Sequence, residues 1–350
     1  MNPALMRASL DMLHYTGLSR AGAALFGGAG AIFMLHHVRP SATFEKAFAP
    51  NAGLDVTPEF LDAVISFVRA RGWQLLSLTE AAARLRSGQL EQPFAVFTLD
   101  DGFRDNLHHA LPVFRRHECP FTVFVAPDYV DGEGELWWDA MERIIAAHDE
   151  IRPGLKGLPD RLDCATPQAK QAAWDKLYWP VRTMGEHRQR QWIREFSAAH
   201  GLDLKELCAE QIMNWEEIRQ LAANPLCTIG AHTLRHYAVA RLSGAQALHE
   251  MTASRERLER ELGRKVTAFA YPYGDAGSAG PRDFSLARQA RFDVAVTTRK
   301  GLLYPAHKDH LMALPRVSLN GFYQKIRYVD VLLTGTPFAL FNGLRRLDVA

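Results

Sequence analysis

The stretch Phe94-Ala95-Val96-Phe97-Thr98-Leu99-Asp100-Asp101-Gly102 is an apolar run that ends abruptly in two adjacent carboxylates and a glycine. Short apolar runs of this kind are typical of buried strands, and the glycine lets the chain turn sharply as it leaves the sheet. Two neighbouring carboxylates repel each other, and burying them without a partner would cost several kcal/mol. A bound cation is the simplest compensation; the alternative is a pair of solvated loop aspartates.

The chain on either side of this stretch alternates between predicted strands and predicted helices. Besides the run at 94–97, strands are predicted at 31–35, 72–76, 121–125, 227–230, 267–270, 292–296 and 314–317. Helices are predicted at 57–70, 77–86, 106–117 and 244–262, the first with a Thr57 cap and the second with a Ser77–Glu80 capping box. This alternation is the signature of βα units around a parallel sheet.

Residues 131–212 break the alternation, because the segment is rich in polar and aromatic residues and has no strand-like apolar run. We interpret it as an inserted helical subdomain close to the site. Its tryptophans could stack on sugar rings, although core packing is the commoner role for such residues. They are Trp137, Trp138, Trp174, Trp179 and Trp192.

Composition and charge limit the classes of protein to which this chain can belong. The 350 residues are 47% hydrophobic and 23% charged, which is ordinary for a soluble globular protein and long enough for one large α/β domain. A net charge of +2 argues against a nucleic-acid partner. The four cysteines are widely spaced with no CxxC, which argues against a zinc knuckle or a disulfide framework and fits a reducing compartment.

The N-terminal region carries two apolar patterns. Residues 21–35 have the length of a signal peptide but lack a strongly cationic flank and a cleavage pattern, so we expect a cytoplasmic protein, with secretion as the alternative. Residues 4–18 place Met6, Leu10 and Leu13 at helical spacing. This indicates an amphipathic helix that packs on the core or lies on a membrane surface.

A second polar stretch, His232-Thr233-Leu234-Arg235-His236, directly follows a predicted strand. Histidines four residues apart can face one point if the segment coils, although such a pair alone is more often structural. Here the pair and the Asp100–Asp101 carboxylates both follow parallel strands, and the carboxyl ends of such strands form one face where sites are built. Two histidines and one aspartate with open positions are typical of a catalytic metal site.

Three motifs, in this order, resemble those of the NodB-homology polysaccharide deacetylases, carbohydrate esterase family four. Thr98–Gly102 is similar to their Thr-Phe-Asp-Asp-Gly, His232–His236 to their His-Ser/Thr-x-x-His, and Phe269–Gly274 to their Phe-Arg-x-Pro-Tyr-Gly. The resemblance spans roughly residues 31–320. It implies an α/β fold, a distorted (β/α)7 barrel that here carries the helical insertion, and a metal-dependent hydrolysis of N- or O-acyl groups on sugars.

The resemblance also implies roles for individual residues. Asp101, His232 and His236 would hold a divalent metal ion, with Zn²⁺ as the default and Co²⁺, Mn²⁺ or Ni²⁺ compatible with the same ligands. Asp100 would be the general base, and the backbone N–H of Tyr273 would help to hold the oxyanion.

Two departures from the family pattern concern the groups around the base. Ala270 stands where the third motif usually has an arginine that orients the base, and Arg316 at the end of the last strand is the candidate replacement. The late Leu-x-His that supplies the general acid is not evident, since Leu314-Pro315-Arg316 stands there, with His307 and His310 just upstream.

The first strand offers another histidine for the site. Leu35-His36-His37-Val38 resembles a Tyr-His-x-Val found early in one branch of the family, which favours His36 as a site residue. Alternation along a strand allows only one of His36 and His37 to face the barrel mouth. The fourth family motif, an aspartate followed by tryptophan, has only a weak match at Asp293.

We therefore predict an N-terminal helical extension (1–30), a deacetylase domain (31–330) with its insertion (131–212), and a C-terminal tail (331–350). Residues 329–346 are apolar and then basic, so they could rest on the inner membrane leaflet or pack on the barrel.

The predicted function is removal of an N-acetyl or other acyl group from a sugar of a polysaccharide or its precursor, in envelope or exopolysaccharide synthesis. The alternatives are a catalytically inactive carbohydrate-binding relative, suggested by the missing arginine, and a hydrolase of a small non-sugar amide. The sugar, the acyl group and the oligomeric state are left open.

Overall fold

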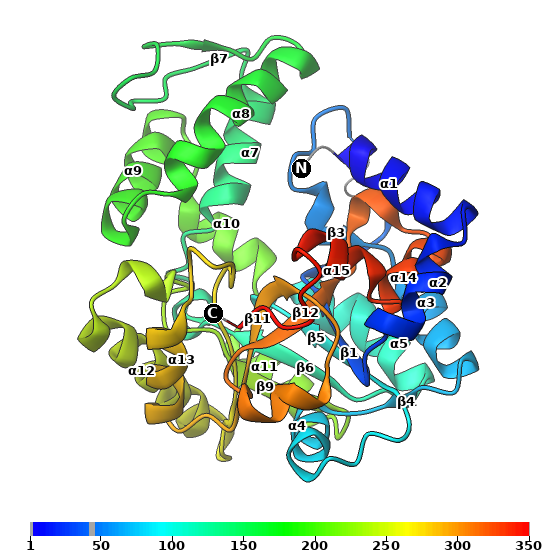
Figure 1. Ribbon diagram of the computed structural model, residues 1–350. Helices are drawn as coiled ribbons and strands as arrows, with labels where there is room; N and C mark the ends of the chain where they lie inside the picture. The colour runs from blue at the N-terminus through cyan, green and yellow to red at the C-terminus, as the bar shows by residue number, and fades with distance from the viewer. Residues whose placement is uncertain (1–2, 42–45, 350) are drawn as a thin grey trace.

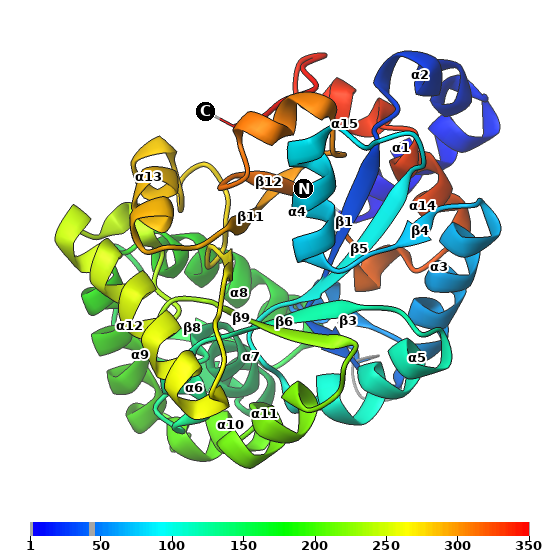
Figure 2. The same cartoon turned by 90° about the horizontal axis from the view of Figure 1, so that it is seen from below.

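The apolar run at 94–99 forms β5 (Phe94–Leu99), which pairs along its whole length with β1 (Gly30–Leu35) and closes a barrel in the computed structural model. The structure describes residues 3–41 and 46–349. Within these ranges seven parallel strands form the ring (Figure 2); after β5 and β1 come β12 (Leu314–Ser318), β11 (Val294–Lys300), β10 (Ala268–Ala270), β9 (Cys227–Ala231) and β6 (Phe121–Val125). The prediction of a distorted (β/α)7 barrel is confirmed.

The strands are buried on both faces, which explains why they read as continuous apolar runs rather than alternating ones. Every residue of β1 and β5 is buried, and the rings of Phe33 and Phe97 stack with centroids 5.0 Å apart. β4 (Gln74–Leu75) adds to the start of β5 outside the ring, and a short parallel pair, β2 (His37–Val38) with β3 (Asp55–Val56), follows the carboxyl end of β1.

Helices cover the outside of the barrel, and their starts follow the capping signals of the sequence. They are α3 (Pro58–Ala70), α4 (Leu78–Ser87), α5 (Leu111–Arg116), α11 (Trp215–Ala222), α12 (Gly244–Leu262) and α13 (Pro281–Gln289). The Thr57 hydroxyl accepts a hydrogen bond from the Phe60 N–H at 3.1 Å, and Ser77 and Glu80 form the capping box. Both caps satisfy first-turn amides that have no partner inside the helix.

Some predicted elements differ from the structure in their type or bounds. The helix expected at 106–117 is a π-helical turn (Asn106–Ala110) followed by α5, because Pro112 has no N–H to donate to the α-helical ladder. The strand expected at 292–296 is β11, which begins at Val294 and runs to Lys300. Its second half was missed because Thr297 and Arg299 are buried although polar.

The segment at 131–212 projects from the barrel as a group of helices, drawn at the upper left of Figure 1. After the short α6 (Pro127–Val130) come α7 (Trp137–Ala147), α8 (Pro167–Arg182), α9 (Glu186–Ala199) and α10 (Leu204–Gln211). A small antiparallel pair, β7 (Glu150–Ile151) with β8 (Leu162–Asp163), was not expected. Four of the five tryptophans are core residues, whereas Trp179 is 65% exposed.

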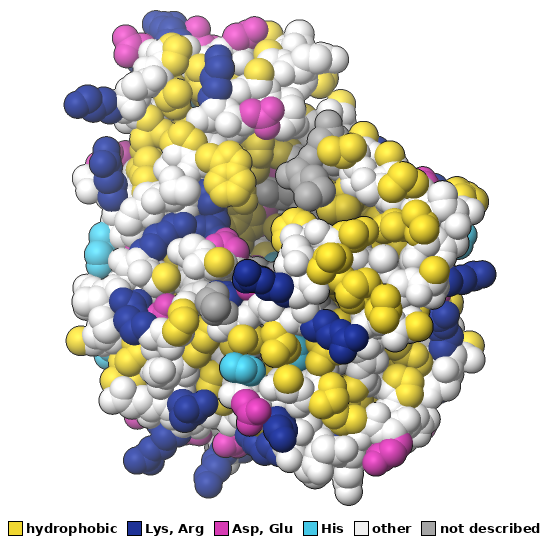
Figure 3. Space-filling model, viewed as in Figure 1, with side chains coloured by type: hydrophobic (Ala, Val, Ile, Leu, Met, Phe, Trp, Pro, Cys, Tyr) yellow, Lys and Arg dark blue, Asp and Glu magenta, His cyan; other side chains and the backbone are white. Residues whose placement is uncertain are grey.

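The two ends of the chain pack on each other. The helix expected at 4–18 ends at Tyr15, because Gly17 takes a φ of 74°, and a second helix follows, so the N-terminal pair is α1 (Pro3–Tyr15) and α2 (Leu18–Phe26). These contact α14 (Ile326–Leu333) and α15 (Thr336–Phe341), and Leu10 and Leu13 share a small core with Tyr328 and Val331. Hydrophobic side chains gather on the surface over these helices (Figure 3). None of the described helices is long and apolar enough to cross a membrane.

We expect β9, the strand that leads to His232, to be intolerant of added volume. A Cβ at Gly230 would lie 2.5 Å from the Phe124 ring and 3.1 Å from the Ala268 carbonyl oxygen, so Gly230→Ala should lower the free energy of unfolding by about 1–3 kcal/mol. Gly244→Ala, at an open position in the first turn of α12, is the matched control and should be neutral or slightly stabilising. Denaturant titration measures both; equal effects would contradict the packing argument.

Candidate active site

Two loops at the carboxyl end of the barrel, after β5 and after β9, bring Asp101, His232 and His236 together. The Nε2 atoms of His232 and His236 lie 3.4 Å and 3.2 Å from the Asp101 Oδ1 atom, and all three side chains are buried. One ligand atom from each residue lies within 4.8 Å of the others. The structure thus assembles the three residues predicted as metal ligands from segments more than 100 residues apart in the chain.

The donor set fits a divalent cation. Asp101 Oδ1 is buried and has no hydrogen-bond partner among the described residues, so a positive ligand would satisfy it. The Nδ1 atom of His232 lies 2.7 Å from the Ala270 carbonyl oxygen; donation there leaves the Nε2 lone pair facing Asp101. Burial lowers the pKa of His236 to about 4, so its imidazole is neutral at pH 7, as a ligand must be.

Backbone strain is concentrated in these two loops and in the loop after β10. Four of the seven described non-glycine residues with positive φ are Asp101 (74°), Thr233 (57°), His236 (59°) and Tyr273 (62°). Residues that carry a side chain disfavour positive φ angles, and the β-branched Thr233 disfavours them most strongly. Residues held in such conformations cluster at functional sites, because the surrounding structure enforces them.

Arg316 forms a two-pronged ion pair with Asp100. Its Nη1 and Nη2 atoms each lie 2.7 Å from one carboxylate oxygen, and its Nε donates to the Thr297 carbonyl oxygen at 2.8 Å. Burial alone would raise the pKa of Asp100, but Arg316 lowers it below its usual range. The guanidinium predicted to replace the missing arginine at Ala270 therefore lies against the proposed base.

The structure separates the two neighbouring histidines after β1. His36 faces the site, with its Nε2 atom 3.9 Å from Asp100 Oδ2, and burial lowers its pKa. His37 points away: its Nδ1 atom lies 2.5 Å from Asp105 Oδ2, and its ring stacks on Phe103.

Other candidates considered from the sequence are not brought to this cluster. His307 accepts a hydrogen bond from the Tyr304 N–H in a short 3-10 helix that contacts α4. The Asp293 N–H donates to Thr267, so this residue lies at the amino end of the barrel strands and does not supply the fourth motif.

The insertion contributes residues that sequence reasoning missed. The Trp137 Nε1–H donates to the Tyr273 hydroxyl at 2.8 Å, and the Arg182 guanidinium lies 3.8 Å from the centre of the same ring. Buried Arg190 donates to the His236 carbonyl oxygen at 3.3 Å. The abundance of tryptophan and arginine in this segment was the only available signal, and it indicated core packing or sugar stacking but not support of the loops.

The Tyr273 loop contains the backbone amide that was predicted to hold the oxyanion. Tyr273 has a φ of 62°, and its N–H has no acceptor among the hydrogen bonds of the described residues. A free amide beside the Asp101–His236 cluster suits the predicted oxyanion contact. The Tyr273 ring itself is held 4.9 Å from the His236 ring, between the insertion and the predicted metal ligands.

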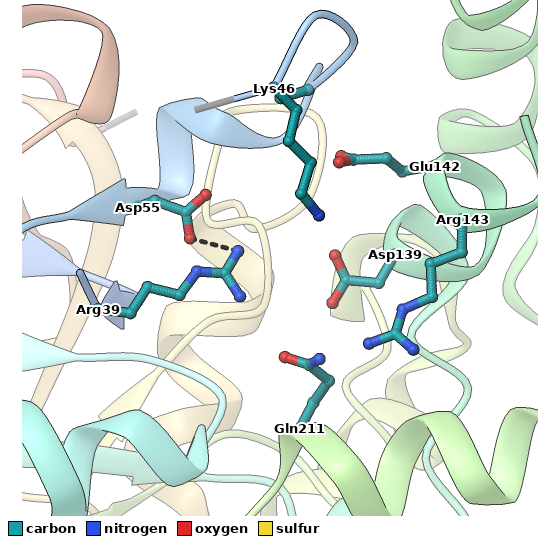
Figure 4. A pocket seen from close by; sticks show the side chains of 8 residues that line it. Arg39, Lys46, Asp55, Asp139, Glu142, Arg143 and Gln211 are labelled. Atoms are coloured by element: carbon teal, nitrogen blue, oxygen red, sulfur yellow. Dashed lines mark ion pairs between the residues drawn. The ribbon is translucent and has the colours of Figure 1, made fainter. Parts of the chain in front are cut away.

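A polar pocket lies between the β2–β3 pair and the insertion (Figure 4). It is lined by Arg39, Lys46, Ala49, Asp55, Asp139, Glu142, Arg143 and Gln211, and no predicted site residue is among them. Arg39 pairs with Asp55 at 2.7 Å, whereas the Asp139 Oδ2 atom has no partner among the described residues. Burial raises the pKa of Asp139 to about 6 and that of Glu142 to about 7.

We expect Asp139 to make stability depend on pH. Its raised pKa means that the folded protein favours the protonated form, so its contribution to stability is present below about pH 4 and is lost as the pH rises through about 6. The difference in free energy of unfolding between Asp139→Asn and wild type should therefore favour the variant by about 1–3 kcal/mol more at pH 8 than at pH 4. Thermal unfolding at both pH values tests this, with exposed Asp160→Asn as the control; the same difference at both pH values would refute it.

Comparison with known proteins agrees with this geometry. The family model for polysaccharide deacetylase matches residues 190–290, a range that contains His232, His236 and Tyr273. No curated protein sequence matches the chain.

Several solved structures share the fold. The Streptococcus pyogenes deacetylase PplD in complex with acetate has a TM-score of 0.56 at 16% identity, and the alignment covers 86% of this chain and 97% of PplD. IcaB from Ammonifex degensii has a TM-score of 0.54 at 19% identity, covering 88% and 97%. A de-N-acetylase from Aggregatibacter actinomycetemcomitans has a TM-score of 0.54 at 12% identity, covering 86% and 99%.

Proposed function

We propose that this chain, an enzyme of the polysaccharide deacetylase family, is a metal-dependent hydrolase that removes an acetyl group from an amino sugar of a polysaccharide or its precursor. The family acts on acetylated polysaccharides. The observation that carries the proposal is the buried Asp101–His232–His236 cluster beside the Asp100–Arg316 ion pair. The cluster suits a bound cation, and the ion pair keeps the Asp100 carboxylate ionised for proton transfer.

Asp101, His232 and His236 would hold the cation, with Zn²⁺ as the default for this donor set and Co²⁺, Mn²⁺ or Ni²⁺ compatible with it. A bound divalent cation polarises an acyl carbonyl and lowers the pKa of a coordinated water. The chain prepares the ligands by burial and by the His232–Ala270 hydrogen bond, which fixes the imidazole orientation.

The remaining residues would move the proton and stabilise charge. Asp100 takes a proton from the attacking water at a carboxylate oxygen, while Arg316 holds this carboxylate ionised and in one orientation. The Tyr273 N–H donates to the oxyanion that forms on the acyl carbon. His36, close to Asp100, delivers a proton to the leaving sugar nitrogen, so the amine and acetate leave as products. Because its pKa is lowered, His36 would receive that proton during the reaction, from Asp100, which has taken it from water and whose Oδ2 atom lies 3.9 Å from His36 Nε2.

The inactive-relative hypothesis loses its main support. It rested on the missing arginine of the third motif, yet Arg316 reaches Asp100 from β12 instead. A protein that only binds carbohydrate has no need of a buried, arginine-paired carboxylate beside the cluster. The other alternative, hydrolysis of a small non-sugar amide, can be distinguished from sugar deacetylation by assaying a panel of amides beside acetylated sugars.

The decisive experiment separates metal binding from turnover. Asp100→Asn should retain bound metal, because Asp100 is not a ligand, but should release acetate from N-acetylated oligosaccharides at least 10²-fold more slowly than wild type. Asp101→Asn is the companion variant and should lose metal as well as activity. Metal analysis and acetate release measure the two properties; wild type without metal, or an active Asp100→Asn enzyme, would overturn the proposal.

A second prediction concerns Arg316. Arg316→Gln removes both contacts to Asp100, so the pKa of that carboxyl should rise and the acid limb of the pH–rate profile should move to higher pH. We expect kcat to fall by about 10–10³-fold with metal content unchanged. Arg104→Gln, which breaks an arginine–glutamate pair away from the cluster, is the control. An unshifted profile in Arg316→Gln would contradict the positioning role.

A cytoplasmic location with peripheral contact to the inner membrane stays a prediction of the sequence. The structure supplies a surface on which the membrane contact can be tested.

A further inference from the structure

The outward faces of the terminal helices carry nearly all the large exposed apolar side chains. Nine such side chains are found among the described residues, and one of them, Trp179, lies on α8. The other eight are Leu5, Met12, Tyr15, Leu18, Leu25, Leu340, Phe341 and Leu344, which we call the terminal patch. Their exposed fractions run from 54% to 73%, so the chain itself does not cover them. Figure 3 shows hydrophobic side chains gathered in this region.

The pattern along α1 explains how the patch arises. Met6, Leu10 and Leu13 face α14 and supply the ordinary buried stripe. The opposite face should then be polar, as on most surface helices. It is instead lined at helical spacing by Leu5, Ala8, Met12 and Tyr15, all exposed.

The second helix repeats this arrangement. Leu18, Ala21 and Leu25, spaced three and four residues apart, are exposed on α2. On its other side Gly22 lies tightly against Thr336, where an added Cβ would be 2.3 Å from the Thr336 hydroxyl oxygen. The α2 helix therefore cannot rotate its apolar face inward without breaking this contact.

Polar contacts also hold the patch in place. Asp11 accepts a hydrogen bond from the Arg327 Nε at 2.8 Å, the Thr336 hydroxyl donates to the Ser19 carbonyl oxygen at 3.0 Å, and the Tyr304 hydroxyl donates to the Phe26 carbonyl oxygen at 2.7 Å. The patch is thus a fixed surface built jointly by the two ends of the chain.

The exposed charges of the two terminal segments are of one sign. The exposed charged residues of 3–26 and 326–349 are all arginines: Arg7, Arg20, Arg345 and Arg346. The three acidic residues in these ranges are partly buried and ion-paired: Asp11 with Arg327, Asp330 with Arg71, and Asp348 with Arg299. A fixed apolar face bordered by arginines complements a surface with an apolar interior and anionic headgroups.

We infer that the terminal patch docks on the surface of an anionic lipid bilayer, with its apolar side chains in the boundary between headgroups and acyl chains and its arginines on the lipid phosphates. The helices lie on the bilayer and do not span it, in keeping with the absence of a membrane-crossing helix among the described residues. This inference does not depend on the proposed activity, since none of the patch residues belongs to the active site.

Vesicle sedimentation tests the inference with the full chain. Wild type should sediment with vesicles of phosphatidylcholine containing phosphatidylglycerol, and less with phosphatidylcholine alone or at high salt. Met12→Gln/Leu18→Gln/Leu25→Gln should reduce the bound fraction at least fivefold, and Arg20→Gln/Arg345→Gln should reduce it on anionic vesicles only. Trp179→Gln, the exposed apolar side chain outside the patch, is the matched control and should bind as wild type.

Unchanged thermal unfolding and unchanged acetate release would show that the variants remain folded. Equal sedimentation of wild type and the apolar triple variant would overturn the inference, as would failure of wild type to bind anionic vesicles. The main competing occupant is a second copy of the chain. A wild-type dimer in sedimentation velocity that the triple variant dissociates, without vesicle binding, would assign the patch to that interface and reject the lipid surface.

Discussion

Two adjacent carboxylates can be buried at the end of β5 only if each finds a positive partner, and the active site is arranged around that requirement. Arg316 reaches across from β12 and pairs with Asp100, while Asp101 faces the imidazoles of His232 and His236 and retains an oxygen without a hydrogen-bond partner among the described residues. The two aspartates therefore have different environments although they are neighbours in the chain. One is suited to stay free and ionised, and the other is suited to ligate a cation.

The position of Arg316 shows how a barrel can supply the same contact from different strands. The third motif has Ala270 where the family has arginine, and the Ala270 backbone carbonyl serves instead as the acceptor that orients His232. Arg316 comes from β12, which lies beside β1 and is separated from β10 by β11. Because the strands close into a ring, their carboxyl ends surround one mouth, and a long side chain from another strand can reach the carboxylate. Thr98 and Thr297 accept its remaining hydrogen bonds and fix its direction.

The insertion acts on the site from the outside. Trp137 and Arg182 hold the Tyr273 ring, Arg190 holds the backbone at His236, and the strained φ angles of these loops require such support. Most tryptophans of the insertion are buried in these contacts or in the core of its helices. The chain ends differ, because their apolar side chains are not all buried. Helices α1 and α2 bury one apolar stripe against α14 and α15 and expose a second.

The sequence by itself determined the strand and helix alternation, the caps at Thr57 and Ser77, and the three motifs whose order implied the barrel and the residues of the cluster. These features are local: apolar runs, capping residues and short polar motifs carry their meaning within a few positions. The sequence named Arg316 and His36 as candidates for the site. Tertiary structure decided that Arg316 contacts Asp100, that His36 rather than His37 faces the site, and that Trp137 supports Tyr273. It also decided that β11 continues through polar Thr297 and Arg299, and that the two chain ends form one surface. Each of these depends on contacts between residues far apart in the chain, and such contacts leave no periodic pattern in the sequence.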